Sequence, residues 1–162
     1  MLILQNLKNY LNLISAFNLS LEEKFVKSYE GEVFRGTSLD KNFIEKKIIE
    51  GKFLTNVCFW SSSKFREIAE NFLSNPNKNI LFRIKTKGYN IDIDSEKLYF
   101  FDEKEVLFIP FSKFLVKSKE KKTFKNKEIY EVQLEEIDKI DREKIKSYYI
   151  TSEESYAFMG NI

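Results

Sequence analysis

The chain lacks histidine altogether, and this absence removes several classes of chemistry. Ser-His-Asp and Cys-His catalysis both need an imidazole, and most protein zinc sites use one as a ligand. Cysteine is nearly absent too: Cys58 stands alone, so no disulfide can form within the chain. We therefore expect no metal ion, and any chemistry must use carboxylates, hydroxyls, arginine, lysine or tyrosine.

An excess of charge of one sign is also lacking. The 27 lysines and arginines nearly balance the 25 aspartates and glutamates and leave a net charge of +2. This balance argues against a nucleic-acid partner and against bulk binding to acidic lipid. Lysines do cluster between Lys117 and Lys127, but Glu120 and Glu128 dilute that run. We interpret the run as a solvated pair of strands with a turn, since charge runs usually reflect solvation.

Long apolar runs are missing as well. No stretch approaches the roughly 20 apolar residues that a membrane-spanning helix needs, so we expect no membrane span. The apolar segment 1–17 is interrupted by polar residues and lacks the basic region and cleavage site of a signal peptide. The sequence leaves the oligomeric state open. It also leaves open whether the protein is secreted or delivered into the cytosol of a target cell.

Apolar residues are nevertheless plentiful. Hydrophobic residues make up 43% of the chain and aromatic residues 15%, which argues against disorder. A length of 162 residues suits one domain, and a chain of about 150 residues buries roughly 68–70% of its unfolded surface. We expect a single domain over 1–162, with an N-terminal helical region at 1–28.

The order of apolar, β-branched and turn-forming residues predicts an α+β fold with N-terminal helices and a mainly antiparallel sheet. Helical spacing predicts a helix over 3–17, and Ser20 with Glu23 has the pattern of a capping box, which predicts a second helix as far as Lys27. Two more helices are expected over 39–50 and after Ser63, which can cap the latter. Strands are expected at 30–38, 53–60, 80–86, 105–111, 112–118 and 127–134, and a charged helix in the tail 138–162.

Three short motifs carry the chemistry, and each has an ordinary structural interpretation when taken alone. Arg35 in VFRGT could be a surface arginine at a strand end. The serine triplet of FWSSS, at 59–63, could simply cap a helix. Glu103 and Glu105, before the apolar VLFIPF, could be charged residues that guard a strand against aggregation.

In this order the motifs resemble the Arg–Ser–Glu class of mono-ADP-ribosyltransferases, which includes arginine-modifying vertebrate ectoenzymes and many bacterial toxins. The matching segments are FRG at 34–36, FWSSS at 59–63 and EKEVLFIP at 103–110. The resemblance covers roughly residues 30–135. It implies a two-sheet β core, NAD⁺ as co-substrate without a metal, and a target protein as acceptor. Ser62 departs from the usual threonine but keeps the hydroxyl.

The resemblance also implies roles for individual residues. Glu105 would hydrogen-bond the ribose beside the breaking bond and stabilise the sugar cation, and Glu103 would deprotonate or orient the acceptor. Ser61 would position Glu105 and contact NAD⁺. Arg35 would hold the phosphates or the adjacent ribose with its permanently charged fork. Gly36 would let the backbone approach the nicotinamide amide.

The proposed reaction suits a chain without histidine. Breaking the glycosidic bond of NAD⁺ produces an oxocarbenium-like transition state that a carboxylate can stabilise. Nicotinamide leaves as a neutral molecule, so no general acid is needed. If their segment is extended, Glu103 and Glu105 point to one side. A glutamate at 103 resembles the arginine-modifying members, so arginine is the first choice of acceptor. Two alternatives stay open: an NAD⁺ glycohydrolase on the same fold, and a non-catalytic α+β binding domain.

Overall fold

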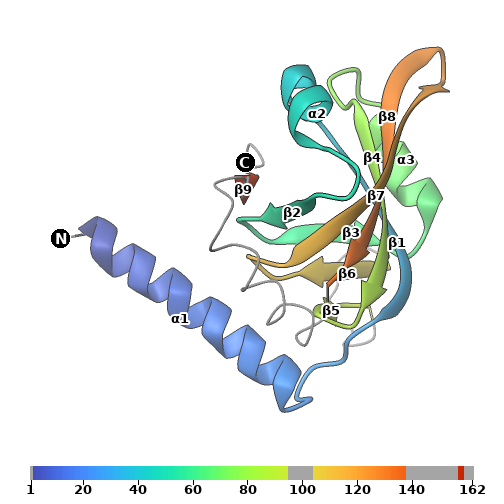
Figure 1. Ribbon diagram of the computed structural model, residues 1–162. Coiled ribbons are helices and arrows are strands. Elements are labelled where there is room, and N and C mark those ends of the chain that lie inside the picture. Colours follow the sequence, from blue (N-terminus) through green and yellow to red (C-terminus); the bar gives the residue numbers. More distant parts are fainter. Residues whose placement is uncertain (1, 95–103, 138–156, 159–162) are drawn as a thin grey trace.

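The computed structural model describes residues 2–94, 104–137 and 157–158, with three helices and nine strands among them (Figure 1). The helices are α1 (Leu2–Glu22), α2 (Lys41–Lys47) and α3 (Arg66–Leu73). The strands are β1 (Glu30–Thr37), β2 (Phe53–Asn56), β3 (Trp60–Ser63), β4 (Ile80–Lys87), β5 (Asn90–Asp92), β6 (Glu105–Phe108), β7 (Lys113–Phe124), β8 (Lys127–Glu136) and β9 (Ala157–Phe158). The α+β class is confirmed. Glu103 and the helix expected in the tail lie outside the described residues.

The strands form one hydrogen-bonded sheet in the order β5-β6-β3-β1-β4-β8-β7-β2-β9, and most neighbours are antiparallel. Two pairs are parallel: β4 with β8, and β2 with β9. The expected arrangement in two sheets is therefore corrected to one continuous sheet. The reason is that β1 pairs on both sides, along its whole length with β4 and at a single position with β3.

The sheet is strongly curved around the larger of two apolar clusters, and the smaller cluster lies between the sheet and α3. Trp60 of β3 stacks on Phe82 of β4 and on Phe114 of β7, with ring centroids 5.3 and 5.4 Å apart. Phe108 of β6 meets Phe114 edge-on at 5.1 Å. Strands that are distant in the sheet order thus contact each other through their side chains. Curvature lets the two halves cover each other's apolar face, which a flat sheet would leave exposed.

A single N-terminal helix replaces the two that the sequence predicts. The α1 helix continues through Glu22, because Ser20 lies inside it rather than at a cap. The Ser20 hydroxyl donates to the carbonyl of Ala16 at 2.8 Å, a bond that a serine makes within a helix. The helix runs along one side of the sheet (Figure 1). Its Tyr10 hydroxyl donates to the carbonyl of Val57 at 3.1 Å.

The segment 53–63 forms two strands instead of the single one expected over 53–60. Asn56 divides them, because its side-chain amide donates to the carbonyls of Cys58 and Ile109 at 2.7 and 2.9 Å and so stabilises a turn. The serine triplet consequently belongs to β3 rather than ending a strand. Ser63 does not cap α3: Phe65 occupies the N-cap position, with no side-chain cap hydrogen bond.

The lysine-rich run forms the strands and turn that the sequence predicts. It spans β7, the turn and the start of β8, and Lys125 and Asn126 at the turn have positive φ angles of 47° and 62°. Positive φ at both central residues is typical of a two-residue hairpin loop. Several of its lysines contact the protein itself; Lys119, for example, donates to the carbonyls of Ile44 and Glu45. These contacts favour a structural role for the run.

Candidate active site

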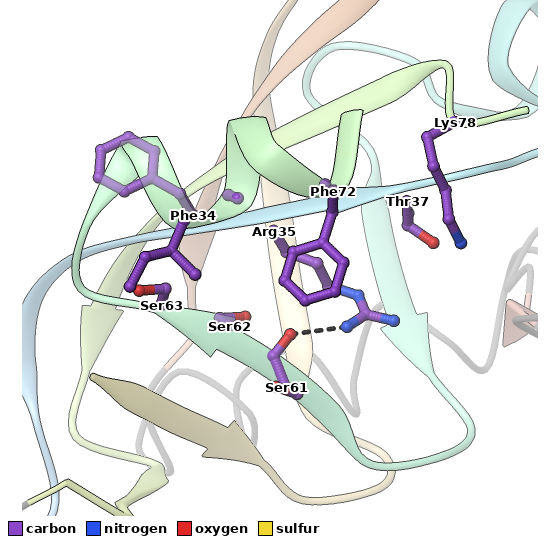
Figure 2. Close-up of a pocket in the computed structure, with 11 residues that line it drawn as sticks. Phe34, Arg35, Thr37, Ser61, Ser62, Ser63, Phe72 and Lys78 are labelled. Carbon is purple, nitrogen blue, oxygen red and sulfur yellow. Dashed lines mark hydrogen bonds between the residues drawn. The ribbon is translucent and has the colours of Figure 1, made fainter. Parts of the chain in front are cut away.

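A crevice forms where β1 and β3 separate. The two strands pair only through Phe34 and Ser63. Beyond that pair the chains diverge, and α3 lies across the gap. The resulting cavity has a volume of about 230 Å³ and is shown in Figure 2. Its walls come from β1, β3, α3 and the turn after α3: Phe34, Arg35, Gly36, Thr37, Ser61, Ser62, Ser63, Ile68, Ala69, Phe72 and Lys78.

Arg35 spans the crevice. Its Nη1 donates to the carbonyl oxygen of Ser61 at 2.6 Å (Figure 2). Its guanidinium carbon lies 5.7 Å from the ring centroid of Trp60. Burial lowers the pKa of the Arg35 guanidinium, yet arginine stays charged at neutral pH. Its Nε has no hydrogen-bond partner among the residues that the structure describes. A permanent cation with spare donors therefore lies in the wall of the cavity.

Gly36 is required by the packing of α3. A Cβ atom at this position would lie 2.3 Å from the carbonyl oxygen of Ala69 and 3.2 Å from Cγ of Leu73. No side chain fits between β1 and the helix, so only glycine allows this close approach. The sequence motif links Gly36 to ligand binding and misses this structural reason. Gly36 nevertheless lines the cavity, as a ligand-binding residue must.

Glu105 lies on the strand next to the crevice. It pairs with Ser63 across β3 and β6, and Leu107 pairs with Ser61. Directly opposed residues of an antiparallel pair project from the same face, so Ser61, Ser63 and Glu105 share one face. Glu105 is the diagonal neighbour of Ser61, a spacing of about 7–8 Å that a long side chain can bridge.

Of the expected site residues, Arg35, Gly36 and Ser61 meet at one cavity. Glu105 is the neighbour of that cavity rather than part of its wall, and Glu103 is outside the described residues. The pairing of β3 with β6 is therefore what links Glu105 to the crevice, because it places Glu105 on the same face as Ser61.

Three further residues of the cavity are not among the site residues expected from the sequence, although Ser62 belongs to the serine triplet of the FWSSS motif. Ser62 is only 5% exposed, and its hydroxyl has no hydrogen-bond partner in the described part of the chain. Phe72 is 50% exposed at the cavity rim, although its place in an apolar helical stripe suggests a core residue. Lys78 adds a second cation to the walls, and no sequence signal distinguishes it from the other lysines.

The part of the chain that the structure describes lacks two features that other functions would need. No group of three or more histidine, cysteine, aspartate or glutamate side chains there could hold a metal ion. None of the described helices is both long enough and apolar enough to cross a membrane.

Comparison with solved structures gives the fold: it is that of the ADP-ribosyltransferase toxins and effectors, and the resemblance predicted from the three motifs is confirmed. Vis, a toxin from Vibrio splendidus, is 27% identical in its complex with agmatine, with a TM-score of 0.58 over 70% of this chain and 52% of that one. No family model and no curated protein matches the sequence. The chain spans about half the length of the Vis structures.

Two more distant neighbours share the fold alone. Plx2a, a toxin from Paenibacillus larvae, is 19% identical, with a TM-score of 0.59 over 77% of this chain and 69% of that one. Exoenzyme S from Pseudomonas aeruginosa, in complex with human 14-3-3 protein beta and bound to carba-NAD, is also 19% identical. Its TM-score is 0.53, over 73% of this chain and 54% of its own.

Proposed function

We propose that this protein transfers ADP-ribose from NAD⁺ to a protein side chain, with Glu105 as the carboxylate that stabilises the sugar cation. One observation carries the proposal: Arg35 and Ser61 meet in a crevice whose neighbouring strand presents Glu105 on the face of Ser61. These are the three residues of the sequence motif, and they come from segments that are far apart in the chain.

The reaction follows from the chemistry of NAD⁺. The bond between the ribose C1′ and the nicotinamide nitrogen breaks, and nicotinamide leaves with the bonding electrons as a neutral molecule. The ribose becomes oxocarbenium-like, and the Glu105 carboxylate offsets its positive charge while accepting a hydrogen bond from the neighbouring hydroxyl. The acceptor then bonds to C1′ and releases a proton.

The other residues would hold the co-substrate. Arg35 offers a permanent cation with a spare donor, which suits the phosphates of NAD⁺ or the adjacent ribose. Ser61 would contact NAD⁺ and help to position Glu105, to which it is diagonal. Gly36 would bring the backbone close to the nicotinamide amide. Exoenzyme S bound to carba-NAD supports NAD⁺ as co-substrate.

Arginine is the acceptor that we propose, with Glu103 serving it. An arginine side chain is always protonated in water, so a nearby carboxylate is needed to make its nitrogen nucleophilic. The complex of Vis with agmatine supports this choice, because agmatine carries the same guanidinium group. The complex of exoenzyme S with 14-3-3 protein shows that a neighbour of this fold binds another protein. XopAI, a type III effector from Xanthomonas axonopodis that is 20% identical over 68% of this chain, supports delivery into another cell.

Incubation with labelled NAD⁺ and a mixed lysate tests the proposal. Mass spectrometry of the labelled proteins should find ADP-ribose on arginine, and the Glu105→Gln variant should label nothing. Free ADP-ribose with every protein unlabelled would instead identify an NAD⁺ glycohydrolase. Unchanged NAD⁺ together with no detectable binding of NAD⁺ would favour a non-catalytic domain.

A further inference from the structure

Four charged side chains form a cluster beside the start of β6. Lys64, which follows β3, lies with Nζ 2.7 Å from a carboxylate oxygen of Asp92 and 3.1 Å from one of Asp94. The other carboxylate oxygen of Asp94 lies 3.2 Å from Nζ of Lys104. Asp94 thus joins two lysines, one following the strand that carries Ser61 and one directly preceding Glu105.

Backbone hydrogen bonds connect the same residues. The amide of Lys64 donates to the carbonyl oxygen of Lys104 at 3.0 Å, and the amide of Asp94 donates to the carbonyl oxygen of Glu105 at 3.3 Å. The two carbonyl groups that flank the Glu105 Cα, those of Lys104 and of Glu105 itself, are therefore both fixed by hydrogen bonds. Because the Glu105 side chain leaves from that Cα, these bonds define the direction in which its carboxylate can extend.

Lys104 adopts an uncommon backbone conformation. Its φ angle is 50°, in the left-handed region that residues other than glycine rarely adopt. Such a residue persists where surrounding contacts hold it, and here those contacts include the Asp94 ion pair and the hydrogen bond from the Lys64 amide. Without them, residue 104 would gain access to ordinary φ angles, and rotation there changes the direction of the chain entering Glu105.

The cluster is shielded enough for its charges to matter. The side chains of Lys64 and Asp94 are 17% and 20% exposed, so water screens their interaction only in part. Burial alone would raise the pKa of Asp94, but hydrogen bonds and charge from Lys64 and Lys104 outweigh it and lower that pKa. Asp94 is therefore ionised at neutral pH, when both lysines are cationic.

We infer that Asp94 is a positioning residue for Glu105: by holding Lys104 and Lys64 together it maintains the orientation of the carboxylate that cleaves NAD⁺. This inference rests on the proposed function for its catalytic consequence. Asp94 itself need not touch NAD⁺. Its removal should lower turnover more than it weakens NAD⁺ binding, because the cavity that contains Arg35 is unaltered.

Glu135 provides a matched control. This carboxylate also joins two lysines, Lys87 at 3.3 Å and Lys117 at 3.5 Å, and is 25% exposed. It lies on β8, which does not pair with β3 or β6. Glu135→Gln and Asp94→Asn thus each remove one negative charge that pairs with two lysines. Glu135 is far from Glu105 in the sheet order, whereas Asp94 lies beside it.

The kinetic test compares nicotinamide release by the two variants and the wild-type protein. Asp94→Asn should lower kcat by roughly 10- to 100-fold, the scale expected for a small misplacement of a reacting group, with KM for NAD⁺ changed less than about twofold. Glu135→Gln should retain the wild-type kcat. Asp94→Glu, which restores a carboxylate, should recover part of the lost turnover. Equal kcat values for Asp94→Asn and Glu135→Gln would overturn the inference.

Hydrogen exchange provides a second test that does not depend on activity. The amides of Lys64 and Asp94 should exchange at least about tenfold faster in Asp94→Asn than in Glu135→Gln, because they donate to the carbonyls beside Glu105. Unchanged exchange at both amides would overturn the inference even if NAD⁺ is cleaved. Faster exchange in a protein that leaves NAD⁺ intact would support the Asp94 contact and contradict the proposed function instead.

Discussion

Arg35 donates a hydrogen bond from Nη1 to the carbonyl oxygen of Ser61, at 2.6 Å, beside the point where β1 and β3 stop pairing. The side chain thus makes a contact between two strands whose ladder has ended. A backbone carbonyl accepts only part of what the guanidinium can donate, since Arg35 has five N–H donors. The arrangement keeps the cation at the cavity and leaves donors for an anionic ligand.

The first prediction concerns Arg35→Lys. Lysine keeps the charge but lacks the fork that can bond Ser61 and a phosphate together. NAD⁺ should therefore bind roughly 13- to 150-fold more weakly, which corresponds to the loss of about 1.5–3 kcal/mol expected for one charged hydrogen bond. Trp60 is the only tryptophan and lies beside Arg35, so its fluorescence can report binding. Arg83→Lys is the control, because Arg83 is paired with Glu32 outside this cavity. Equal affinities in the two variants would contradict a ligand-binding role for Arg35.

The second prediction separates the two glutamates. Glu105→Gln should reduce both transfer and NAD⁺ hydrolysis by at least about a hundredfold, because both pass through the same sugar cation. Glu103→Gln should reduce transfer to arginine far more than hydrolysis, because water needs no such activation. Nicotinamide release and protein labelling measure the two activities in one reaction. Glu128→Gln, on the distant β7–β8 hairpin, should match the wild type.

If Glu103→Gln lowers transfer and hydrolysis equally, Glu103 does not act on the acceptor side. If Glu105→Gln keeps substantial hydrolysis, another group stabilises the cation, and the assignment of the motif to this chain fails. The two variants therefore test the cleavage of NAD⁺ and the choice of acceptor independently.

Local patterns predicted most of the strands around the site, because alternation and β-branched residues are properties of a short segment. The serine triplet was harder, since serine suits both a helix cap and a strand. Its true place depends on pairing with Val106 and neighbouring residues of β6. The continuation of α1 through Ser20 was missed for a similar reason, because capping and intrahelical bonding compete for one hydroxyl.

The shape of the site depends on contacts between segments that are far apart in the chain, so local sequence patterns could not predict it. The crevice exists because β1 and β3 part after the Phe34–Ser63 pair. The Asp94–Lys64 contact joins residues 30 positions apart. Three motifs in the right order could indicate a family, but neither separation of strands nor side-chain pairing at such a distance is a local pattern.

The third prediction is that Gly36→Ala destabilises the fold. The added Cβ would lie 2.3 Å from the carbonyl oxygen of Ala69, which is backbone and cannot rotate away. Either β1 or α3 must shift, at a cost of about 1–3 kcal/mol for overpacking. Urea unfolding at neutral pH measures this difference in free energy. A loss below about 0.5 kcal/mol, the range of neutral surface substitutions, would show that the helix can move without cost.

The fourth prediction concerns the pH dependence of stability through Glu131. The Arg66 guanidinium meets this buried carboxylate with both terminal nitrogens, at 2.8 and 3.3 Å, and so ties α3 to β8. Burial raises the pKa of Glu131, but the hydrogen bonds and charges of Arg66 and Lys122 outweigh burial and hold that pKa below its ordinary value. The folded state therefore binds the Glu131 proton less readily than the unfolded state does.

A carboxylate with a depressed folded pKa stabilises the fold above its unfolded pKa of about 4.3, and this stabilisation is lost as pH falls through the folded pKa. Glu131→Gln should therefore lower the free energy of unfolding by about 1–3 kcal/mol at pH 7. This loss is smaller than the one expected on breaking a fully buried ion pair, because Arg66 is partly exposed. The difference in the free energy of unfolding between this variant and the wild type should disappear between roughly pH 5 and pH 3. Glu128→Gln, which alters an exposed pair with Lys121, should change the unfolding curves by under about 1 kcal/mol at any pH. Wild-type and Glu131→Gln curves that stay parallel down to pH 3 would mean that Arg66 does not stabilise the ionised form.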